Sequence, residues 1–288
     1  MKHWIAAFRL KTLPLAMGAI LLGSTLHSEM FDGQIFCFAA ITAILLQILS
    51  NLANDYGDFV KGTDKHRTDR QLAGGNITPK AMLNAIVLFA VLVLGSGIYL
   101  LNLAFADNWN YWLTFLGVGV ASIIAAIAYT VGKKAYGYNG LGDVFVFIFF
   151  GLVGVLATSF LFNQSFQWMS LLPATAYGCL CVGVLNVNNI RDLDKDVLAN
   201  KITLASKLGK SGALRYQTIL VVTAFVGFFT YHLIDSSWSL APLGALVLGI
   251  IHLKKLKAAV HSLDYNQQLK MLSLGSFGVV VLFALGLF

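Results

Sequence analysis

The stretch from Asn51 to Asp64, which reads NLANDYGDFVKGTD, decides how the rest of the chain is interpreted. It follows a wholly apolar run and carries three carboxylates and two amides. Four of its residues fall at i, i+3, i+4 and i+7, and so share one face of a helix: Asn51, Asn54, Asp55 and Asp58. Carboxylates on one face beside a membrane repel each other unless a cation neutralises them, and such oxygen clusters suit Mg²⁺. A solvated helix end is the alternative interpretation.

A second stretch, residues 186–196, repeats this design. It reads NVNNIRDLDKD and again follows directly on an apolar run. Asn188, Asp192 and Asp196 stand at i, i+4 and i+8, and Asn54, Asp58 and Gly62 have the same spacing in the first stretch. Two acidic clusters at the same depth can hold metal ions between them, with a polyanion bridging the metals.

The composition indicates a polytopic membrane protein. Apolar residues make up 58% of the chain and charged residues 11%, whereas a soluble domain carries about 25% charged residues. Long unbroken apolar runs predict helices rather than a β-barrel. We therefore expect one all-α domain over residues 1–288, with the acidic motifs at 51–64 and 186–196 as a pseudo-repeat.

Nine spans are predicted, at about 13–28, 34–53, 81–104, 111–130, 140–162, 169–189, 214–233, 237–253 and 270–288. All 20 Lys and Arg residues lie in five segments on one side of these spans: the N-terminus, 54–80, 131–138, 190–215 and 254–270. The positive-inside rule makes that side cytoplasmic and puts the C-terminus outside. The formal charge of +7 is then mainly a topology signal, which argues against nucleic acid as a partner and allows contact with anionic lipid.

Basic residues follow both acidic motifs, as a diphosphate site requires. They include Arg67 and Arg70 after the first motif and Lys201 after the second. Tyr129 and Lys133 are four residues apart, so a helical end would put them on one face. For each of these cations, a charge that only sets membrane orientation is the competing interpretation. Asp143 lies just inside a span and is either a functional acid or a helix N-terminal residue.

These motifs resemble the UbiA superfamily of intramembrane prenyltransferases. The family pattern is Asn-Asp-x2-Asp, then Tyr-x3-Lys, then Asp-x3-Asp, which here corresponds to residues 54–58, 129–133 and 192–196. The resemblance covers most of the chain and implies nine helices around a central cavity, open sideways to lipid and capped by cytoplasmic loops. It also implies Mg²⁺ as cofactor, an isoprenoid diphosphate as donor and a place in the bacterial cytoplasmic (inner) membrane.

Within the superfamily, the sequence is most similar to the branch whose acceptor is 1,4-dihydroxy-2-naphthoate. The stretches RLKTLPLAMGAILLGS, NDYGDFVKGTD, YTVGKKAYGYNGLGD and NNIRDLDKDVLANKITLASKLG carry this similarity. It implies transfer of a polyprenyl group to the naphthoate ring, with loss of CO₂ and diphosphate, to give demethylmenaquinone.

The resemblance assigns roles to particular residues. The implied metal ligands are Asp55, Asp58, Asp192 and Asp196, with Asp64 as the nearest substitute for an acid that relatives carry where this chain has Gly62. The implied diphosphate-binding residues are Asn54, Arg67, Arg70, Lys133, Asn188 and Lys201. The implied catalytic residues are Asp58, Asp192, Lys133 and Tyr129, and Tyr129 and Asp143 are candidates for taking the aromatic proton.

Three other functions stay open at this point. A related aromatic prenyltransferase would keep the metal motifs and accept 4-hydroxybenzoate or homogentisate, although Gln71 follows Arg70 where hydroxybenzoate enzymes often have proline. A secondary transporter fits the internal repeat, but its charges would lie near the membrane midplane. A membrane scaffold without activity would not need intact acidic motifs.

Overall fold

The computed structural model describes residues 2–26, 30–64, 70–235 and 239–286, and these residues form helices joined by loops without a β-sheet. The all-α prediction is therefore confirmed. The first half of the chain contains α1 (Lys2–Ala7), η1 (Leu10–Thr12), α2 (Leu13–Thr25), α3 (Gly33–Val60), α4 (Pro79–Phe105), α5 (Trp109–Ala128) and η3 (Tyr136–Tyr138). The second half contains α6 (Gly142–Val146), η4 (Phe147–Ala157), α7 (Thr158–Asn163), η5 (Trp168–Ser170), α8 (Leu171–Arg191), α9 (Leu193–Leu198), α10 (Leu204–Asp235), α11 (Ala241–Lys257) and α12 (Ser262–Leu285).

The helices have the length and surface of membrane-spanning segments. Among the described residues, 8 helical segments are long and apolar enough to cross a membrane. The predicted span 237–253 corresponds to α11, which has 17 residues and is not one of these, so the count of nine stays a prediction. Large apolar side chains lie on the outside, such as Val91, Ile219 and Ile250, where lipid would solvate them.

The helices extend beyond the predicted membrane spans. Helix α3 continues past residue 53 to Val60, within the first acidic motif, and α12 begins at Ser262, before residue 270. Lys270 is therefore a helical residue and not part of a loop. Helix α10 starts at Leu204 but is kinked at Gly209 (φ 67, ψ 170), so its spanning part begins after Gly209, close to the predicted residue 214. Apolar runs mark only the part of a helix within the hydrocarbon core, and the helices continue beyond it.

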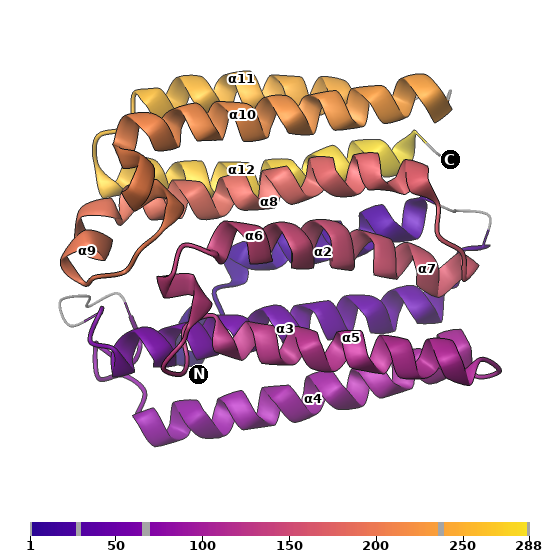
Figure 1. The fold of residues 1–288 in the computed structure, drawn as a ribbon, viewed down its shortest axis with the longest axis horizontal. Helices are drawn as coiled ribbons and strands as arrows, with labels where there is room; N and C mark the ends of the chain where they lie inside the picture. Colours follow the sequence, from indigo (N-terminus) through magenta and orange to yellow (C-terminus); the bar gives the residue numbers. More distant parts are fainter. Residues whose placement is uncertain (1, 27–29, 65–69, 236–238, 287–288) are drawn as a thin grey trace.

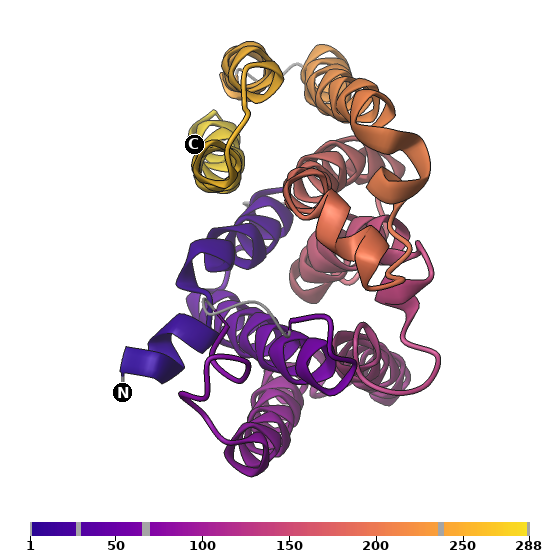
Figure 2. The ribbon, with the colours of Figure 1, turned by 90° about the vertical axis from the view of Figure 1, so that its left-hand side faces the viewer.

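The helices form two groups with two elements between them (Figure 1). Helices α3, α4 and α5 pack together, and α8, α10, α11 and α12 form the second group. Helix α2 and the continuous run formed by α6, η4 and α7 contact both groups. The loop after α3, the turn containing η3 and helix α9 all lie at one end of the molecule, and Figure 2 shows this end facing the viewer.

A buried chain of polar side chains fixes α8 within the second group. Asn186 Nδ2 donates to Ala213 O at 3.0 Å and to Gln217 Oε1 at 2.8 Å. The Gln217 Nε2 group then faces His252 Nε2 at 3.0 Å, and His252 Nδ1 lies 3.2 Å from Gln268 Oε1. Because the Gln217 amide donates to Nε2, the imidazole is neutral and donates from Nδ1. These bonds connect α8 to α10, α11 and α12 at the first residue of the second acidic stretch.

A second polar tie holds the N-terminal turn against α3. Asn51 Nδ2 donates to Phe8 O at 2.9 Å and to Thr12 Oγ1 at 3.1 Å. Between these two acceptors, Arg9 has φ 49 and ψ 56, a left-handed conformation that is uncommon for a residue other than glycine. The Asn51 side chain therefore shapes this turn, a role that its place on the acidic face did not reveal.

The interface between η4 and α8 depends on small residues. A Cβ added to Gly151 would lie 2.7 Å from Gly178 Cα and 2.8 Å from Ala174 O, which are backbone atoms that cannot rotate away. We predict that Gly151→Ala separates these helices and lowers the free energy of unfolding by about 1–3 kcal/mol. Thermal unfolding in detergent measures this. Gly117→Ala is the control, because its added Cβ meets nothing within 4 Å. Its melting temperature should equal or exceed that of wild type. Equal melting temperatures of Gly151→Ala and Gly117→Ala would contradict the prediction.

The Asn51 tie gives a second prediction. Asn51→Leu keeps the approximate volume but leaves Phe8 O without its side-chain donor, which should cost about 1–3 kcal/mol of stability. Thermal unfolding of the purified protein measures the loss. Asn84→Leu, on the exposed face of α4, is the matched control and should melt close to wild type. An Asn51→Leu protein as stable as the control would show that the turn does not depend on this side chain.

Candidate functional site

A cavity of about 910 Å³ lies between the two helix groups, and both acidic motifs line it. Asn51, Asn54, Asp55 and Asp58 all face it from α3, so the predicted shared face is confirmed. Asn188, Asp192 and Asp196 face it from α8 and α9. The polar end of the cavity is thus built from residues that lie more than a hundred positions apart in the chain.

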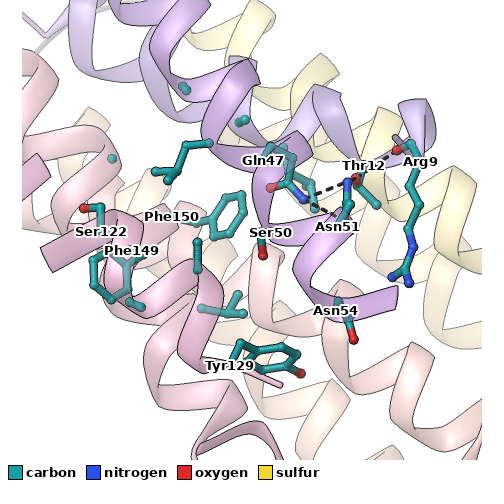
Figure 3. Close-up of a pocket in the computed structure, with 18 of the residues that line it drawn as sticks. Arg9, Thr12, Gln47, Ser50, Asn51, Asn54, Ser122, Tyr129, Phe149 and Phe150 are labelled. Carbon is teal, nitrogen blue, oxygen red and sulfur yellow. Dashed lines mark hydrogen bonds between the residues drawn. The ribbon is translucent and has the colours of Figure 1, made fainter. Parts of the chain in front are cut away.

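In the first motif, an arginine from the N-terminal turn joins the carboxylates. With the Asn54 amide oriented to satisfy both neighbours, Nδ2 donates to Asp58 Oδ2 at 2.9 Å and Oδ1 accepts from Arg9 Nη1 at 3.3 Å. Figure 3 shows the Arg9 side chain directed toward Asn54. Asp55 accepts hydrogen bonds from the backbone amides of Gln71 and Leu72. Its buried Oδ1 has no hydrogen-bond partner among the described residues.

The end of the first motif turns at a glycine. Gly62 has φ 73, a left-handed conformation that would strain an aspartate at this position. The chain then places Asp64 in a buried position, where Asp64 Oδ2 lies 3.3 Å from Arg70 Nε. Both residues line the cavity. The geometry thus indicates that Asp64 orients Arg70, while its role as a metal ligand stays a prediction.

In the second motif, Arg191 holds the polar side chains together. Its Nε donates to Asp192 Oδ1 at 3.0 Å and its Nη2 to Asp192 Oδ2 at 2.6 Å, a bidentate pair. Nη2 also donates to Asn188 Oδ1 at 2.8 Å, and Nη1 donates to Asn266 Oδ1 at 2.7 Å on α12. Helix α8 ends at Arg191, but Asp192 and Asp196 continue the helical hydrogen bonding from Asn188, which keeps the three predicted residues on one side.

Lys201 lies between the two motifs. Its Nζ is 4.0 Å from Asp58 Oδ1 and 3.9 Å from Asp196 Oδ1. These two carboxylate oxygens are therefore at most about 8 Å apart. Asp58 is 2% exposed and Asp196 5%, so the attraction to a shared cation is only weakly screened by water.

A tyrosine in the turn before α6 also contacts the first motif. Tyr138 Oη donates to Asp58 Oδ1 at 2.7 Å and also contacts Thr63 Oγ1. Burial, and next the Asp58 carboxylate, hold the pKa of the Tyr138 phenol above its ordinary value. The phenol therefore stays protonated and acts as the donor.

The predicted pair Tyr129 and Lys133 is not brought together. Helix α5 ends at Ala128, and Gly132 has φ 96, so no helical turn carries Lys133 onto the face of Tyr129. Tyr129 lines the cavity, whereas Lys133 is exposed and is not a lining residue. Asp143 is buried but does not line the cavity either.

Of the remaining predicted cations, Arg70 and Lys201 line the cavity, and Arg67 lies outside the described residues. Sequence reasoning missed Arg9, Arg191 and Tyr138 as site residues. In the sequence, Arg9 and Arg191 stand out only as charges that set the orientation in the membrane. The adjacency of Arg191 to Asp192 was a signal for the bidentate pair, but nothing local pointed to Arg9 or Tyr138, because their partners lie 45 and more residues away.

Away from the acidic motifs the cavity wall is mainly apolar, with single polar side chains such as Gln47 and Ser122. Helical run η4 contributes Phe149, Phe150 and Val153, and small residues such as Ala16 and Gly119 line other parts. In Figure 3, Phe149 and Phe150 lie on the same side of the cavity as Ser122. The site therefore combines a charged end with a water-excluding interior that can accept a long hydrocarbon chain.

The described residues do not form a complete metal cage. No three His, Cys, Asp or Glu side chains in these parts of the chain come close enough to hold a metal ion by themselves. The donor chemistry nevertheless fits Mg²⁺, which is commonly held by one or two carboxylates, with phosphate oxygens of the substrate and water completing the shell. The buried Oδ1 of Asp55, which has no hydrogen-bond partner among the described residues, is a suitable ligand atom.

The amino-acid sequence was compared with those of known protein families and proteins. The model of the UbiA prenyltransferase family matches residues 12–283. A 1,4-dihydroxy-2-naphthoate octaprenyltransferase of Haemophilus influenzae is 40% identical over 83% of this chain and 80% of its own length. The protein of that name from Escherichia coli (strain K12) is 39% identical over 99% of this chain and 94% of its own length.

Solved structures show the same fold. A UbiA homolog from Archaeoglobus fulgidus bound to GPP and Mg²⁺ superposes with a TM-score of 0.68, at 12% identity, over 97% of this chain and 99% of that chain. At this identity the likeness concerns the fold alone. The family match extends over nearly the whole chain, and relatives of about 40% identity share its length, so the chain belongs to the UbiA prenyltransferase family.

Proposed function

We propose that this protein transfers a polyprenyl group from its diphosphate to 1,4-dihydroxy-2-naphthoate, with loss of CO₂ and diphosphate, to give the prenylated naphthoquinol, which is the reduced form of demethylmenaquinone. The observation that carries the proposal is the convergence of Asp58 and Asp196 on Lys201 at the charged end of an apolar cavity. The names of the two bacterial relatives support the naphthoate acceptor and a long prenyl donor.

We infer that four carboxylates would hold Mg²⁺ ions at this end of the cavity: Asp55, Asp58, Asp192 and Asp196. When bound, Mg²⁺ supplies Lewis-acid stabilisation of the charge that develops on the leaving diphosphate. A UbiA homolog with the same fold is bound to GPP and Mg²⁺, which supports Mg²⁺ as the metal. Asp192 is also paired with Arg191, which orients its carboxylate and reduces repulsion between the acids.

The chain's cations bind the diphosphate from several sides. Arg70 is held by Asp64, and Lys201 lies between the motifs, so both point into the charged end and neutralise the departing anion. Asn54 and Asn188 orient the neighbouring charged groups through their amides. The apolar walls exclude water from the allylic cation left by this departure, so the electron-rich naphthoate ring captures it instead.

The apolar helices and the family membership make the chain an integral membrane protein. We infer that it lies in the bacterial cytoplasmic membrane with its N-terminus and charged site facing the cytoplasm and its C-terminus outside. The positive-inside rule supports this orientation, and the loops after α3, α5 and α8 lie together at one end of the molecule (Figure 1).

The reaction itself can be tested with purified protein in lipid nanodiscs. We expect octaprenyl diphosphate and 1,4-dihydroxy-2-naphthoate to give prenylated naphthoquinol by mass spectrometry with Mg²⁺, and none with EDTA, because the leaving diphosphate then lacks its counter-ions. 4-Hydroxybenzoate serves as the competing acceptor. Product from hydroxybenzoate only would move the assignment to another acceptor, and no product from either acceptor would refute the proposal.

The metal ligands can be tested separately. Asp58→Asn and Asp192→Asn should each lower kcat/KM by about 100-fold or more, because a neutral amide does not replace a carboxylate ligand. Asp32→Asn is the matched control: Asp32 caps α3 at its other end by accepting from Gln34 N and Ile35 N, and asparagine caps equally well. Wild-type rates in the motif variants would exclude these carboxylates from the reaction.

A further inference from the structure

Tyr138 lies behind the charged end of the cavity rather than in it. Asp58, Thr63 and Lys201 line the cavity, whereas Tyr138 does not. Yet Tyr138 contacts all three: its phenol donates to Asp58 Oδ1 at 2.7 Å, it contacts the Thr63 hydroxyl, and the Lys201 Nζ is 5.3 Å from its ring centroid. Any effect of Tyr138 on a ligand in the cavity must therefore pass through these neighbours.

The phenol restricts the Asp58 carboxylate. Asp58 Oδ1 accepts from Tyr138, and Oδ2 accepts from Asn54 Nδ2 at 2.9 Å. With one donor on each oxygen, the plane of the carboxylate is fixed, and each oxygen keeps further lone pairs for other ligands. Outer-shell hydrogen bonds of this kind orient metal-binding groups and are commonly worth 10- to 100-fold in metal affinity.

Two lysine side chains lie over the Tyr138 ring, close to the Asp58 carboxylate. Lys61 Nζ lies 3.9 Å from the Tyr138 ring centroid and Lys201 Nζ 5.3 Å, both within the range of cation–π attraction. Lys201 is in turn the cation shared by Asp58 and Asp196. Tyr138 therefore influences the position of a charge that faces both motifs.

The backbone of Tyr138 connects the second motif's loop to the first. Ile202 N donates to Tyr138 O at 3.1 Å, and Asn139 and Ile202 form a β-bridge. This bridge places Lys201, the residue next to Ile202, beside Asp58. One residue thus joins three segments: the end of α3, the turn before α6 and the loop after α9.

We propose that Tyr138 is a positioning residue that holds the Asp58 carboxylate and Lys201 in the arrangement required to bind Mg²⁺ together with the prenyl diphosphate. The inference rests on the proposed function, because it concerns the metal that Asp58 would hold. A role limited to stabilising the loops is the competing explanation, and it makes a different prediction: it affects the melting temperature but not the Mg²⁺ concentration that the protein requires.

The chain contains a matched control for this distinction. Tyr265 is also buried, its phenol donates to Ala259 O at 3.1 Å, and Lys210 Nζ lies 5.8 Å from its ring centroid. Tyr265 does not line the cavity. Tyr265→Phe therefore removes the same kind of hydrogen bond, beside the same kind of cation, without touching the acidic motifs.

The experiment is a Mg²⁺ titration of wild type, Tyr138→Phe and Tyr265→Phe with farnesyl thiolodiphosphate, an unreactive diphosphate analogue. The melting temperature is the readout, and the Mg²⁺ dependence of product formation is measured in parallel. We expect Tyr138→Phe to need about 10- to 100-fold more Mg²⁺ for half-maximal stabilisation. Tyr265→Phe should lower the melting temperature without Mg²⁺ but keep the wild-type half-maximal concentration.

Failure of the Tyr138 inference and failure of the proposed prenyl transfer give different results in this experiment. An unchanged or lowered Mg²⁺ requirement in Tyr138→Phe overturns the inference, as does an equal shift in Tyr265→Phe or a wild type that Mg²⁺ does not stabilise. Wild-type protein that shows the Mg²⁺ shift but makes no prenylated naphthoquinol refutes the proposed function alone. If Tyr138→Phe does not fold, Thr63→Val removes the other partner of the phenol, and a smaller shift in the same direction is expected. No shift in Thr63→Val then overturns the inference.

Discussion

The site depends on the neutralisation of buried carboxylates by cations from other segments. Asp58 and Asp196 are nearly inaccessible to water, and each alone would be costly to bury as a charge. Lys201 lies within 4.0 Å of both, so one cation holds together two motifs that would otherwise repel each other. Within the second motif, the Arg191 guanidinium neutralises the Asp192 carboxylate. The charged end of the cavity exists because these pairs form.

The helices are arranged so that this charged end meets an apolar interior. Helices α3 and α8 come from different groups, yet both deliver their acidic motif to the same end of one cavity. The buried chain from Asn186 to Gln268 fixes the rotation of α8, and Asn51 fixes the N-terminal turn that carries Arg9. A prenyl diphosphate needs both environments at once, since its anion requires cations and its tail requires hydrocarbon.

Much of the fold and part of the site could be predicted from sequence. The apolar runs predicted the helices, and the spacing of Asn54 and Asp58 predicted a shared face, because both signals are local. Helix ends were predicted less well, since helices such as α3 and α12 extend beyond the hydrocarbon and carry polar residues there. Lys133 does not share a face with Tyr129 because a four-residue spacing implies a shared face only inside a helix, and α5 ends at Ala128, before both residues.

The sequence by itself determined that the protein is helical and embedded in a membrane, and it determined that Asp55 and Asp58 share one face of α3 and that Asp192 and Asp196 follow α8 at helical spacing. Both follow from hydropathy and helical periodicity, which act over a few residues. Only the tertiary structure decided which group faces each carboxylate: Tyr138 and Lys201 at Asp58, and Arg9 beside Asn54. These contacts join residues tens to over a hundred positions apart, so the paths of the loops and the packing of the helices set them, and no local pattern encodes them.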